Sequence, residues 1–389
     1  MSDINRFLSD RIVSVKPSGI RKFFDIAAEM KNVISLGIGE PDFVTPWHIR
    51  DAGIYALEKG HTYYTSNSGL PELRTEICRY LERRFGLDYD LAEILVTIGG
   101  SEAIDCCVRS VVNPGDEVLI PEPSFVCYSP IVTFAGGVPV VLETYEQDDF
   151  KLKAADIEKA ITPKTRMLIL PYPNNPTGAV LDKKDVEEIA AVAKKHGIFV
   201  LSDEIYAELT YGQTHFSIGA VEGMKDLCVV VNGFSKSYAM TGWRLGYAAG
   251  PKEIISAMTK MHQYAIMSAP TMSQFAAIEA LKCGDGDIEL MREEYDGRRQ
   301  LILDGVRSIG FSCFEPRGAF YIFPNIKASG MKSYDFCEGL IRDQSVAVIP
   351  GDAFGDSGEG YVRMCYAASA KNISEAIERM KVYLDKVKK

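Results

Sequence analysis

The interpretation of the whole chain depends on one stretch, Asn232-Gly233-Phe234-Ser235-Lys236-Ser237-Tyr238-Ala239-Met240-Thr241-Gly242-Trp243-Arg244-Leu245-Gly246-Tyr247. It follows the apolar, β-branched run Val229–Val231, yet its lysine, arginine and three glycines are poor material for a hydrophobic core. A lysine directly after a buried strand reaches a site of low dielectric, where its pKa falls and its neutral amine becomes nucleophilic. We therefore expect Lys236 to take part in chemistry, and the rest of the chain must supply its partners.

Composition excludes several classes of protein. The chain has 389 residues, 47% of them hydrophobic and 25% charged, which is typical of a globular protein with a large and a smaller domain. A formal net charge of −10, without any block rich in lysine or arginine, argues against nucleic-acid binding. No apolar run approaches the roughly 20 residues of a membrane helix, and residues 1–15 lack the apolar segment of a signal peptide. We predict a cytoplasmic protein that binds neither nucleic acid nor membranes.

Cysteine and histidine spacing does not favour a metal centre. The nine cysteines are odd in number and contain no C-x-x-C pair, and the five histidines are scattered without paired spacing. Structural, buried cysteines are the simpler interpretation, so we expect neither a disulfide framework nor a metal.

From about Asp51 the sequence alternates helical periodicity with short apolar runs. Helices are expected at 70–85, 101–112, 183–196, 252–263, 271–282 and 288–309, and strands at 94–96, 118–120, 138–142, 167–170, 199–201, 228–231, 319–323, 346–349 and 361–364. Apolar strands separated by helices indicate a mainly parallel sheet covered on both faces. We predict an α/β fold with an N-terminal arm and part of a small domain at 1–45, a large domain at 46–285, and a smaller α+β domain at 286–389.

Polar residues follow three of the predicted strands, where open α/β sheets bind their ligands. Asn175 follows the strand at 167–170 and is held extended by Pro176. Asp203 ends the strand at 199–201 and is followed by Tyr206, while Lys236 follows the strand at 228–231. A buried carboxylate needs a partner, so we expect a cation or a protonated ring nitrogen beside Asp203. An ordinary turn at Asn175 and a salt bridge or helix cap at Asp203 are the simpler alternatives.

A second set of residues suits anions. Gly100, Ser101 and Glu102 join the strand at 94–96 to a helix whose free N–H groups attract a phosphate, although a plain turn capped by Ser101 is equally compatible. Ser235 and Arg244 add a hydroxyl and a planar cationic fork, so a phosphorylated cofactor is indicated.

Arg363 is a third candidate for anion binding. It lies in the predicted strand at 361–364, where an arginine is costly unless it meets an anion. That anion is either a ligand or a structural ion-pair partner.

These segments together resemble the class I/II aminotransferases, pyridoxal-phosphate enzymes of fold type I, with a large and a smaller domain. The resemblance runs from Ser18 to near the C-terminus and rests, in order, on Asn174-Asn175-Pro176-Thr177-Gly178, Ser202-Asp203-Glu204-Ile205-Tyr206, Ser235-Lys236 and Met240-Thr241-Gly242-Trp243-Arg244-Leu245-Gly246-Tyr247. It implies that Lys236 binds pyridoxal 5′-phosphate as a Schiff base and later moves the substrate proton. It also implies that Asp203 pairs with the pyridinium nitrogen.

The resemblance assigns further roles by position. Cofactor contacts are implied for Asn175 and Tyr206 at the phenolic oxygen, for Phe125 on the ring face, and for Gly100, Ser101, Glu102, Ser235 and Arg244 at the phosphate. Substrate contacts are implied for Gly39, Asn175 and Arg363, with Arg363 taking the α-carboxylate. Tyr64 matches a tyrosine that reaches the phosphate from the neighbouring subunit, which implies a homodimer with shared sites.

The implied activity is transamination between an L-amino acid and a 2-oxo acid, and we expect aromatic donors with 2-oxoglutarate. Aspartate, alanine or N-acetyl-diaminopimelate aminotransferases share every motif above, so they remain alternatives. A pyridoxal-phosphate C–S lyase would keep Lys236, Asp203 and Arg363. A cofactor-sensing regulator would need a DNA-binding module, for which the sequence has no room, and a nicotinamide dehydrogenase would need a G-x-G-x-x-G motif, which is missing.

Overall fold

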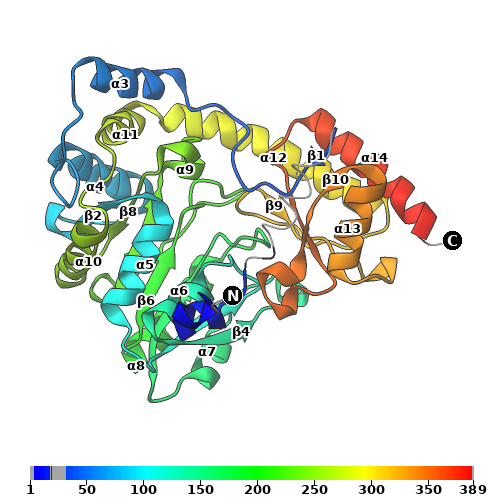
Figure 1. Ribbon diagram of the computed structural model, residues 1–389, viewed down its shortest axis with the longest axis horizontal. Coiled ribbons are helices and arrows are strands. Elements are labelled where there is room, and N and C mark those ends of the chain that lie inside the picture. Colours follow the sequence, from blue (N-terminus) through cyan, green and yellow to red (C-terminus); the bar gives the residue numbers. More distant parts are fainter. Residues whose placement is uncertain (1–3, 18, 20–31, 388–389) are drawn as a thin grey trace.

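The computed structural model describes residues 4–17, 19 and 32–387. Its centre is a seven-stranded sheet in which β8 is antiparallel to both neighbours and the other paired strands are parallel, as predicted (Figure 1). Across the sheet, the strands are β2 (Ile94–Thr97), β8 (Gly246–Ala249), β7 (Cys228–Gly233), β6 (Phe199–Asp203), β5 (Thr165–Leu170), β3 (Glu117–Glu122) and β4 (Val138–Glu143).

Helices bury both faces of this sheet. Successive residues of β7 belong to different hydrophobic cores, with Val229 and Val231 on one face and Val230 on the other. The first face is covered by α5 (Gly99–Val111), α6 (Tyr128–Ala135) and α10 (Lys252–Ala265). The second is covered by α4 (Pro71–Phe85), α8 (Lys183–His196) and α11 (Thr271–Cys283). Burial on both sides explains why the strands are continuous apolar runs.

Two small sheets lie among the C-terminal helices. One is antiparallel, in the order β11 (Ile349–Pro350), β12 (Val362–Cys365) and β9 (Tyr321–Ile322), and the other pairs β1 (Ile34–Ser35) in parallel with β10 (Val346–Ala347). The helices are α12 (Asp285–Ser308), α13 (Ser333–Gln344) and α14 (Ala370–Val387). One core cluster runs from these helices to the second face of the large sheet. The predicted division at 45/46 and 285/286 therefore stays a prediction, and part of 1–45 lies outside the described residues.

Some predicted strands have different limits in the structure. β8 was not predicted, because its Gly-Tyr-Ala-Ala sequence has no apolar pattern. The strand expected at 319–323 shortens to β9, just before Pro324, which has no N–H for a ladder. The strand expected at 346–349 is two strands, β10 and β11, because the chain passes from one small sheet to the other at Val348.

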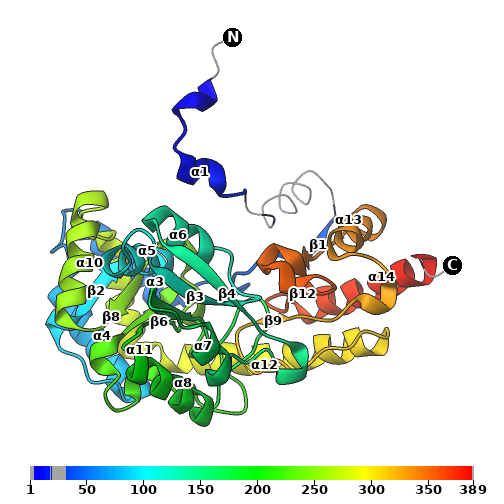
Figure 2. The same cartoon turned by 90° about the horizontal axis from the view of Figure 1, so that it is seen from below.

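The remaining elements are short or peripheral. They include α1 (Asp10–Ser14), α3 (Trp47–Glu58), α7 (Ala154–Ala160), α9 (Phe234–Ser237) and 3-10 turns at Ile4–Phe7, Leu91–Glu93, Glu146–Asp148, Ile218–Ala220, Lys225–Leu227, Thr241–Trp243, Lys327–Ser329, Gly351–Phe354 and Asp356–Gly358. Figure 2 shows α1 standing away from the rest of the chain, to which Arg11 Nη1 connects it by donating to the Phe134 carbonyl at 3.1 Å. Within the described ranges, no helix is long and apolar enough to cross a membrane.

Candidate active site

A cavity of about 340 Å³ opens where β5, β6 and β7 end. All predicted site residues except Glu102 and Tyr64 line it, namely Gly39, Gly100, Ser101, Phe125, Asn175, Asp203, Tyr206, Ser235, Lys236, Arg244 and Arg363. The parallel strands bring these residues together because their carboxyl ends share one edge of the sheet.

Lys236 lies on α9, directly after β7. Its Nζ donates to the Gly39 carbonyl at 2.8 Å. Burial lowers the pKa of Lys236 from its usual value near 10.5 to about 8. About a tenth of the amine is therefore neutral at pH 7, in the form that nucleophilic attack on an aldehyde requires.

Asp203 ends β6 and is 6% exposed. Tyr128 Oη donates to its Oδ2 at 2.8 Å, and the Ile205 N–H donates to Oδ1 at 3.2 Å. Burial raises the pKa of Asp203 to about 6, while the Tyr128 hydrogen bond works in the opposite direction. No ion pair to Asp203 occurs within the residues that the structure describes, so the structural salt bridge considered above is not found. The bond from the Ile205 N–H is the local contact that the cap alternative predicts, and the Tyr128 hydroxyl is the partner of this carboxylate from another element.

Arg363 lies in β12 and is 3% exposed. Its Nη1 donates to Asn175 Oδ1 at 3.0 Å and its Nη2 to the Gly37 carbonyl at 2.5 Å. Its Nε is buried without a hydrogen-bond partner, and no carboxylate of the described chain pairs with the guanidinium. A buried cation without a counter-charge is suited to an anionic ligand.

An anion cradle lies at the start of α5, opposite Arg244. A Cβ at Gly246 would lie 2.6 Å from the Gly99 carbonyl carbon, and one at Gly99 would lie 2.8 Å from Arg244 Nη2, so these segments need glycine to approach so closely. Arg244 donates to the Thr241 carbonyl at 3.1 Å and keeps further N–H groups available. The helix N-terminus, this fork and the Ser235 hydroxyl fit a phosphate, while Lys236 and Asp203 fit an aldehyde and a ring nitrogen. Pyridoxal phosphate carries all three groups.

Glu102 and Tyr64 lie outside the cavity lining. The Glu102 carboxylate accepts from the Ile98 N–H at 2.5 Å and lies 2.7 Å from His262 Nδ1, which leaves its backbone N–H as its means of binding a phosphate. Tyr64 is 80% exposed, and its predicted role requires a second subunit.

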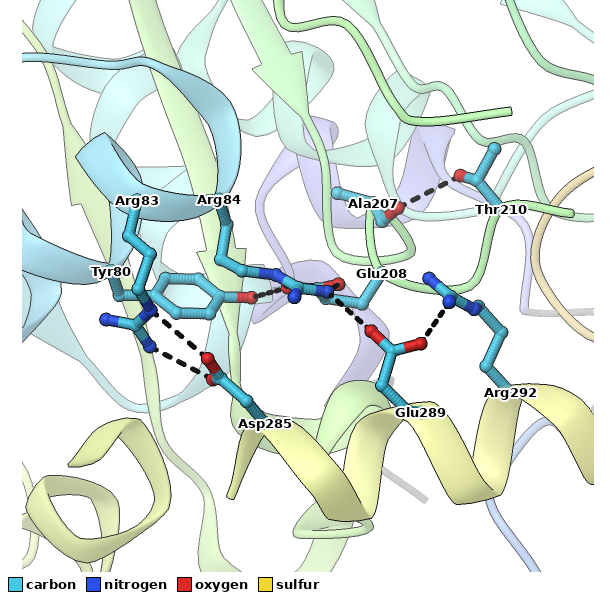
Figure 3. A network of polar contacts seen from close by, with 9 residues as sticks. All are labelled: Tyr80, Arg83, Arg84, Ala207, Glu208, Thr210, Asp285, Glu289 and Arg292. Atoms are coloured by element: carbon cyan, nitrogen blue, oxygen red, sulfur yellow. Dashed lines mark hydrogen bonds and ion pairs between the residues drawn. The ribbon is translucent and has the colours of Figure 1, made fainter. Parts of the chain in front are cut away.

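A buried polar network fixes the turn that follows Tyr206 (Figure 3). Glu208 is 4% exposed and accepts from Tyr80 Oη at 2.6 Å and from Arg84 Nη2 at 2.5 Å. Arg84 also pairs with Glu289 of α12 at 3.2 Å. The turn carrying Tyr206 is thereby attached to both α4 and α12.

Two tyrosines at the cavity were missed from the sequence. Tyr128 on α6 donates to Asp203, and Tyr321 on β9 has its Oη 2.8 Å from Tyr206 Oη. The only available signal for Tyr128 was its position three residues after Phe125, whereas Tyr321 looked like an ordinary core residue of an aromatic strand.

Comparisons with known proteins agree with this geometry. Residues 31–380 match the family "Aminotransferase class I and II". A protein of Bacillus subtilis (strain 168) that is provisionally named aminotransferase YugH is 54% identical over 98% of this chain and 99% of its own. The aspartate aminotransferase of Pyrococcus abyssi (strain GE5 / Orsay) is 47% identical over 97% of this chain and 98% of its own. The crystal structure of the aromatic aminotransferase from Pyrococcus horikoshii OT3 superimposes with a TM-score of 0.90 at 45% identity, covering 95% of this chain and 99% of that one.

These matches extend over nearly the whole chain and confirm both the resemblance and the predicted fold type I. The chain belongs to the class I and II aminotransferases, enzymes that use pyridoxal phosphate to exchange amino groups between amino acids and 2-oxo acids.

Proposed function

We propose that this aminotransferase moves the amino group of an aromatic L-amino acid to 2-oxoglutarate. The observation that carries the choice of donor is the lining of the cavity, which includes the apolar and aromatic side chains of Ile38, Ile104, Phe125, Tyr128, Ile205 and Tyr321. Of these, the ring of Tyr321 lies directly against Arg363, with its centroid 4.6 Å from the guanidinium carbon. Burying an aromatic ring of the substrate against such a surface lowers the free energy of the complex. Related proteins named for aspartate, aromatic and N-acetyl-LL-diaminopimelate substrates are all similar to this chain, so the lining is the better guide.

In this proposal Lys236 holds the cofactor and its Nζ moves the proton at the substrate Cα. Bound pyridoxal phosphate supplies an electron sink for the charge that develops at that carbon. Asp203 keeps a proton on the ring nitrogen, and Tyr128 holds its carboxylate in place. Asn175 and Tyr206 bind the phenolic oxygen, Phe125 covers the ring face, and the phosphate is held by Gly100, Ser101, Glu102, Ser235 and Arg244.

The same proposal gives the α-carboxylate of the substrate to Arg363, with Gly39 and Asn175 beside it. Each of the three cations of the cavity, Lys236, Arg244 and Arg363, then faces one ligand group. The second carboxylate of 2-oxoglutarate needs a further cation, which the neighbouring subunit of a dimer would supply. Aspartate would use the same cation, so direct measurement must separate the two donors.

Support for a homodimer comes from exposed apolar side chains in the segment that precedes Tyr64 and at the end of α10: Val44, Trp47, Ile54, Tyr55, Leu57, Tyr63, Tyr264 and Met267. If Tyr64 completes the partner's site, mixing the inactive variants Lys236→Ala and Tyr64→Ala should restore about a quarter of the sites, because half of the dimers are mixed and each has one intact site. Activity that stays at the level of the separate variants would contradict shared sites.

The nine cysteines are all free, which supports a reducing compartment such as the cytoplasm.

A donor and acceptor screen tests the proposed substrate. Tyrosine and phenylalanine should exceed aspartate and alanine in kcat/KM by at least about tenfold with 2-oxoglutarate, and pyruvate should be the poorer acceptor. A preference for aspartate would refute the aromatic donor and leave transamination intact. Pyruvate released from cystathionine without any 2-oxo acid would instead indicate lyase chemistry.

A further inference from the structure

Tyr321 links the cofactor side of the cavity to its substrate side. It lies on β9 and is 1% exposed. Its Oη is 2.8 Å from Tyr206 Oη, and the Arg363 guanidinium carbon lies 4.6 Å from the centroid of its ring. One side chain therefore touches both the residue proposed for the phenolic oxygen and the residue proposed for the α-carboxylate.

The surroundings of Tyr321 leave its ring little freedom. A Cβ on Gly39 would lie 2.3 Å from Tyr321 Oη, so the backbone there packs directly on the hydroxyl. Gly39 also accepts from Lys236 Nζ, and the Gly37 carbonyl accepts from Arg363 Nη2. Because packed side chains change rotamer only when their neighbours move, Tyr321 keeps these groups in one arrangement.

The hydroxyl of Tyr321 differs from those of nearby buried tyrosines. Tyr211 and Tyr366 donate to the Ala319 carbonyl at 2.7 and 3.0 Å, which is an ordinary structural use. Among the described residues, Tyr321 Oη hydrogen-bonds only the Tyr206 hydroxyl. Burial raises the pKa of both phenols, so both keep their protons. One proton serves the bond between them, and the other remains to be donated to a ligand.

We propose that Tyr321 is a positioning residue that aims the Tyr206 hydroxyl at the cofactor and supports Arg363 against the substrate. In this arrangement the Tyr321 O–H donates to the Tyr206 oxygen, and the Tyr206 O–H donates to the phenolic oxygen of the cofactor. The inference rests on the proposed roles of Tyr206 and Arg363. Successive hydrogen bonds strengthen one another, so loss of the Tyr321 hydroxyl leaves more negative charge on the phenolic oxygen. The lysine-bound chromophore then keeps its proton to higher pH.

The first experiment titrates the absorbance of the lysine-bound chromophore in holoenzyme. Tyr321→Phe should raise the midpoint by roughly half a pH unit or more, because it removes one hydrogen bond from the chain. Tyr366→Phe is the matched control: it removes an equally buried hydroxyl away from the cavity and should leave the midpoint unchanged. In the background of Tyr206→Phe, the Tyr321→Phe substitution should cause no further shift, since Tyr321 acts through Tyr206.

The second experiment separates the ring from the hydroxyl. Tyr321→Phe keeps the ring under Arg363, so the KM for the amino donor should stay within about twofold of wild type. Tyr321→Leu removes the ring and should raise that KM roughly fivefold or more. If Tyr321→Leu does not fold, the Tyr321→Phe value alone decides, and a larger rise in its KM overturns the assigned role of the ring.

Other outcomes distinguish a failure of this inference from a failure of the proposed function on which it rests. If wild-type protein shows the lysine-bound chromophore and Tyr321→Phe has the same titration midpoint, the positioning role is refuted, while the roles of Lys236 and Tyr206 stand. A further shift in the double variant shows that Tyr321 does not act through Tyr206. Wild-type protein without any lysine-bound chromophore contradicts the proposed roles and this inference together.

Discussion

The two sides of the cavity are built differently. The floor consists of Asp203, Tyr206 and Lys236, which follow adjacent parallel strands of one sheet. The roof consists of Gly39, Tyr321 and Arg363. Tyr321 and Arg363 lie on paired strands of one small sheet, whereas Gly39, 282 residues before Tyr321, reaches them from the N-terminal part of the chain. The floor is a property of one sheet edge, whereas the roof exists only when distant segments pack together. We therefore expect the floor to control the cofactor and the roof to control the substrate, with the Tyr321–Tyr206 hydrogen bond as the contact through which the roof affects the cofactor.

The largest expected effect is at the floor. Lys236→Ala should abolish the lysine-bound chromophore and lower kcat by at least about 10³-fold, because Lys236 supplies the only side-chain amine among the described residues that line the cavity. Absorbance spectra and single-turnover rates measure both quantities. Lys225→Ala, which removes a surface lysine paired with Glu93 at 3.0 Å, is the control and should behave like wild type. An unchanged spectrum in Lys236→Ala would refute the central assignment.

The next effect belongs to the roof. Arg363→Lys keeps the charge but loses the planar fork, so kcat/KM for the amino donor should fall about 10- to 100-fold while the chromophore persists. Steady-state kinetics and the spectrum of the same sample provide the test. Arg342→Lys changes an exposed arginine paired with Glu338 and should have no effect. Loss of the chromophore in Arg363→Lys would break the proposed division between floor and roof.

The contrast between floor and roof also explains what could be predicted from sequence. The floor was predictable because residues after buried strands converge at one sheet edge, whatever the connecting helices do. Arg363 was found because a cation in an apolar strand is unusual. Tyr321 was missed because an aromatic residue in an apolar strand is normal core composition. Its function depends on a contact with Tyr206, 115 residues earlier, which no local pattern encodes.

Prediction of the fold from local sequence patterns has the same limit. The sheet and most helices followed from apolar periodicity, since burial on both faces leaves a clear pattern in the sequence. The strand β8 left no such pattern, because it begins with Gly246, which lies in close contact with Gly99 and Gly100 of α5, and contains two small alanines. The direction in which Glu102 turns, toward His262, likewise depends on α10 and could not be read locally.

The third prediction is a pH effect at the floor. With a pKa of about 8, neutral Lys236 increases from about a tenth at pH 7 to half at pH 8 and levels off above pH 9. The rate at which cofactor-free protein captures pyridoxal phosphate should follow this curve and rise about fivefold from pH 7 to 8. Free Nα-acetyl-lysine, with an ordinary amine, is the control and should gain about tenfold per unit up to pH 10. A protein rate that keeps rising in that way would contradict the lowered pKa.

The smallest effects concern how each side is anchored: the floor to α4 and, through Arg84, to α12, and the roof to α12. At the floor, Glu208→Gln leaves Arg84 without its most buried partner and should lower the free energy of unfolding by about 2–3 kcal/mol. At the roof, Asp42→Asn breaks the pair with Arg298, which at 2.7 Å joins the segment after Gly39 to α12. Because Asp42 is 31% exposed, solvent screens this pair and the expected loss is about 1 kcal/mol.

Urea unfolding monitored by circular dichroism gives both values, with Glu187→Gln, which removes an exposed pair with Lys183 on α8, as a control that should change little. Glu208→Gln should also weaken cofactor binding, because the turn behind Tyr206 loses its attachment to α4. Asp42→Asn should instead raise the KM for the amino donor, since the segment that it holds carries Gly39 and borders Tyr321 and Arg363. Equal effects of the two substitutions on cofactor and substrate would mean that floor and roof form one cooperative unit, because each anchor would then stabilise both sides.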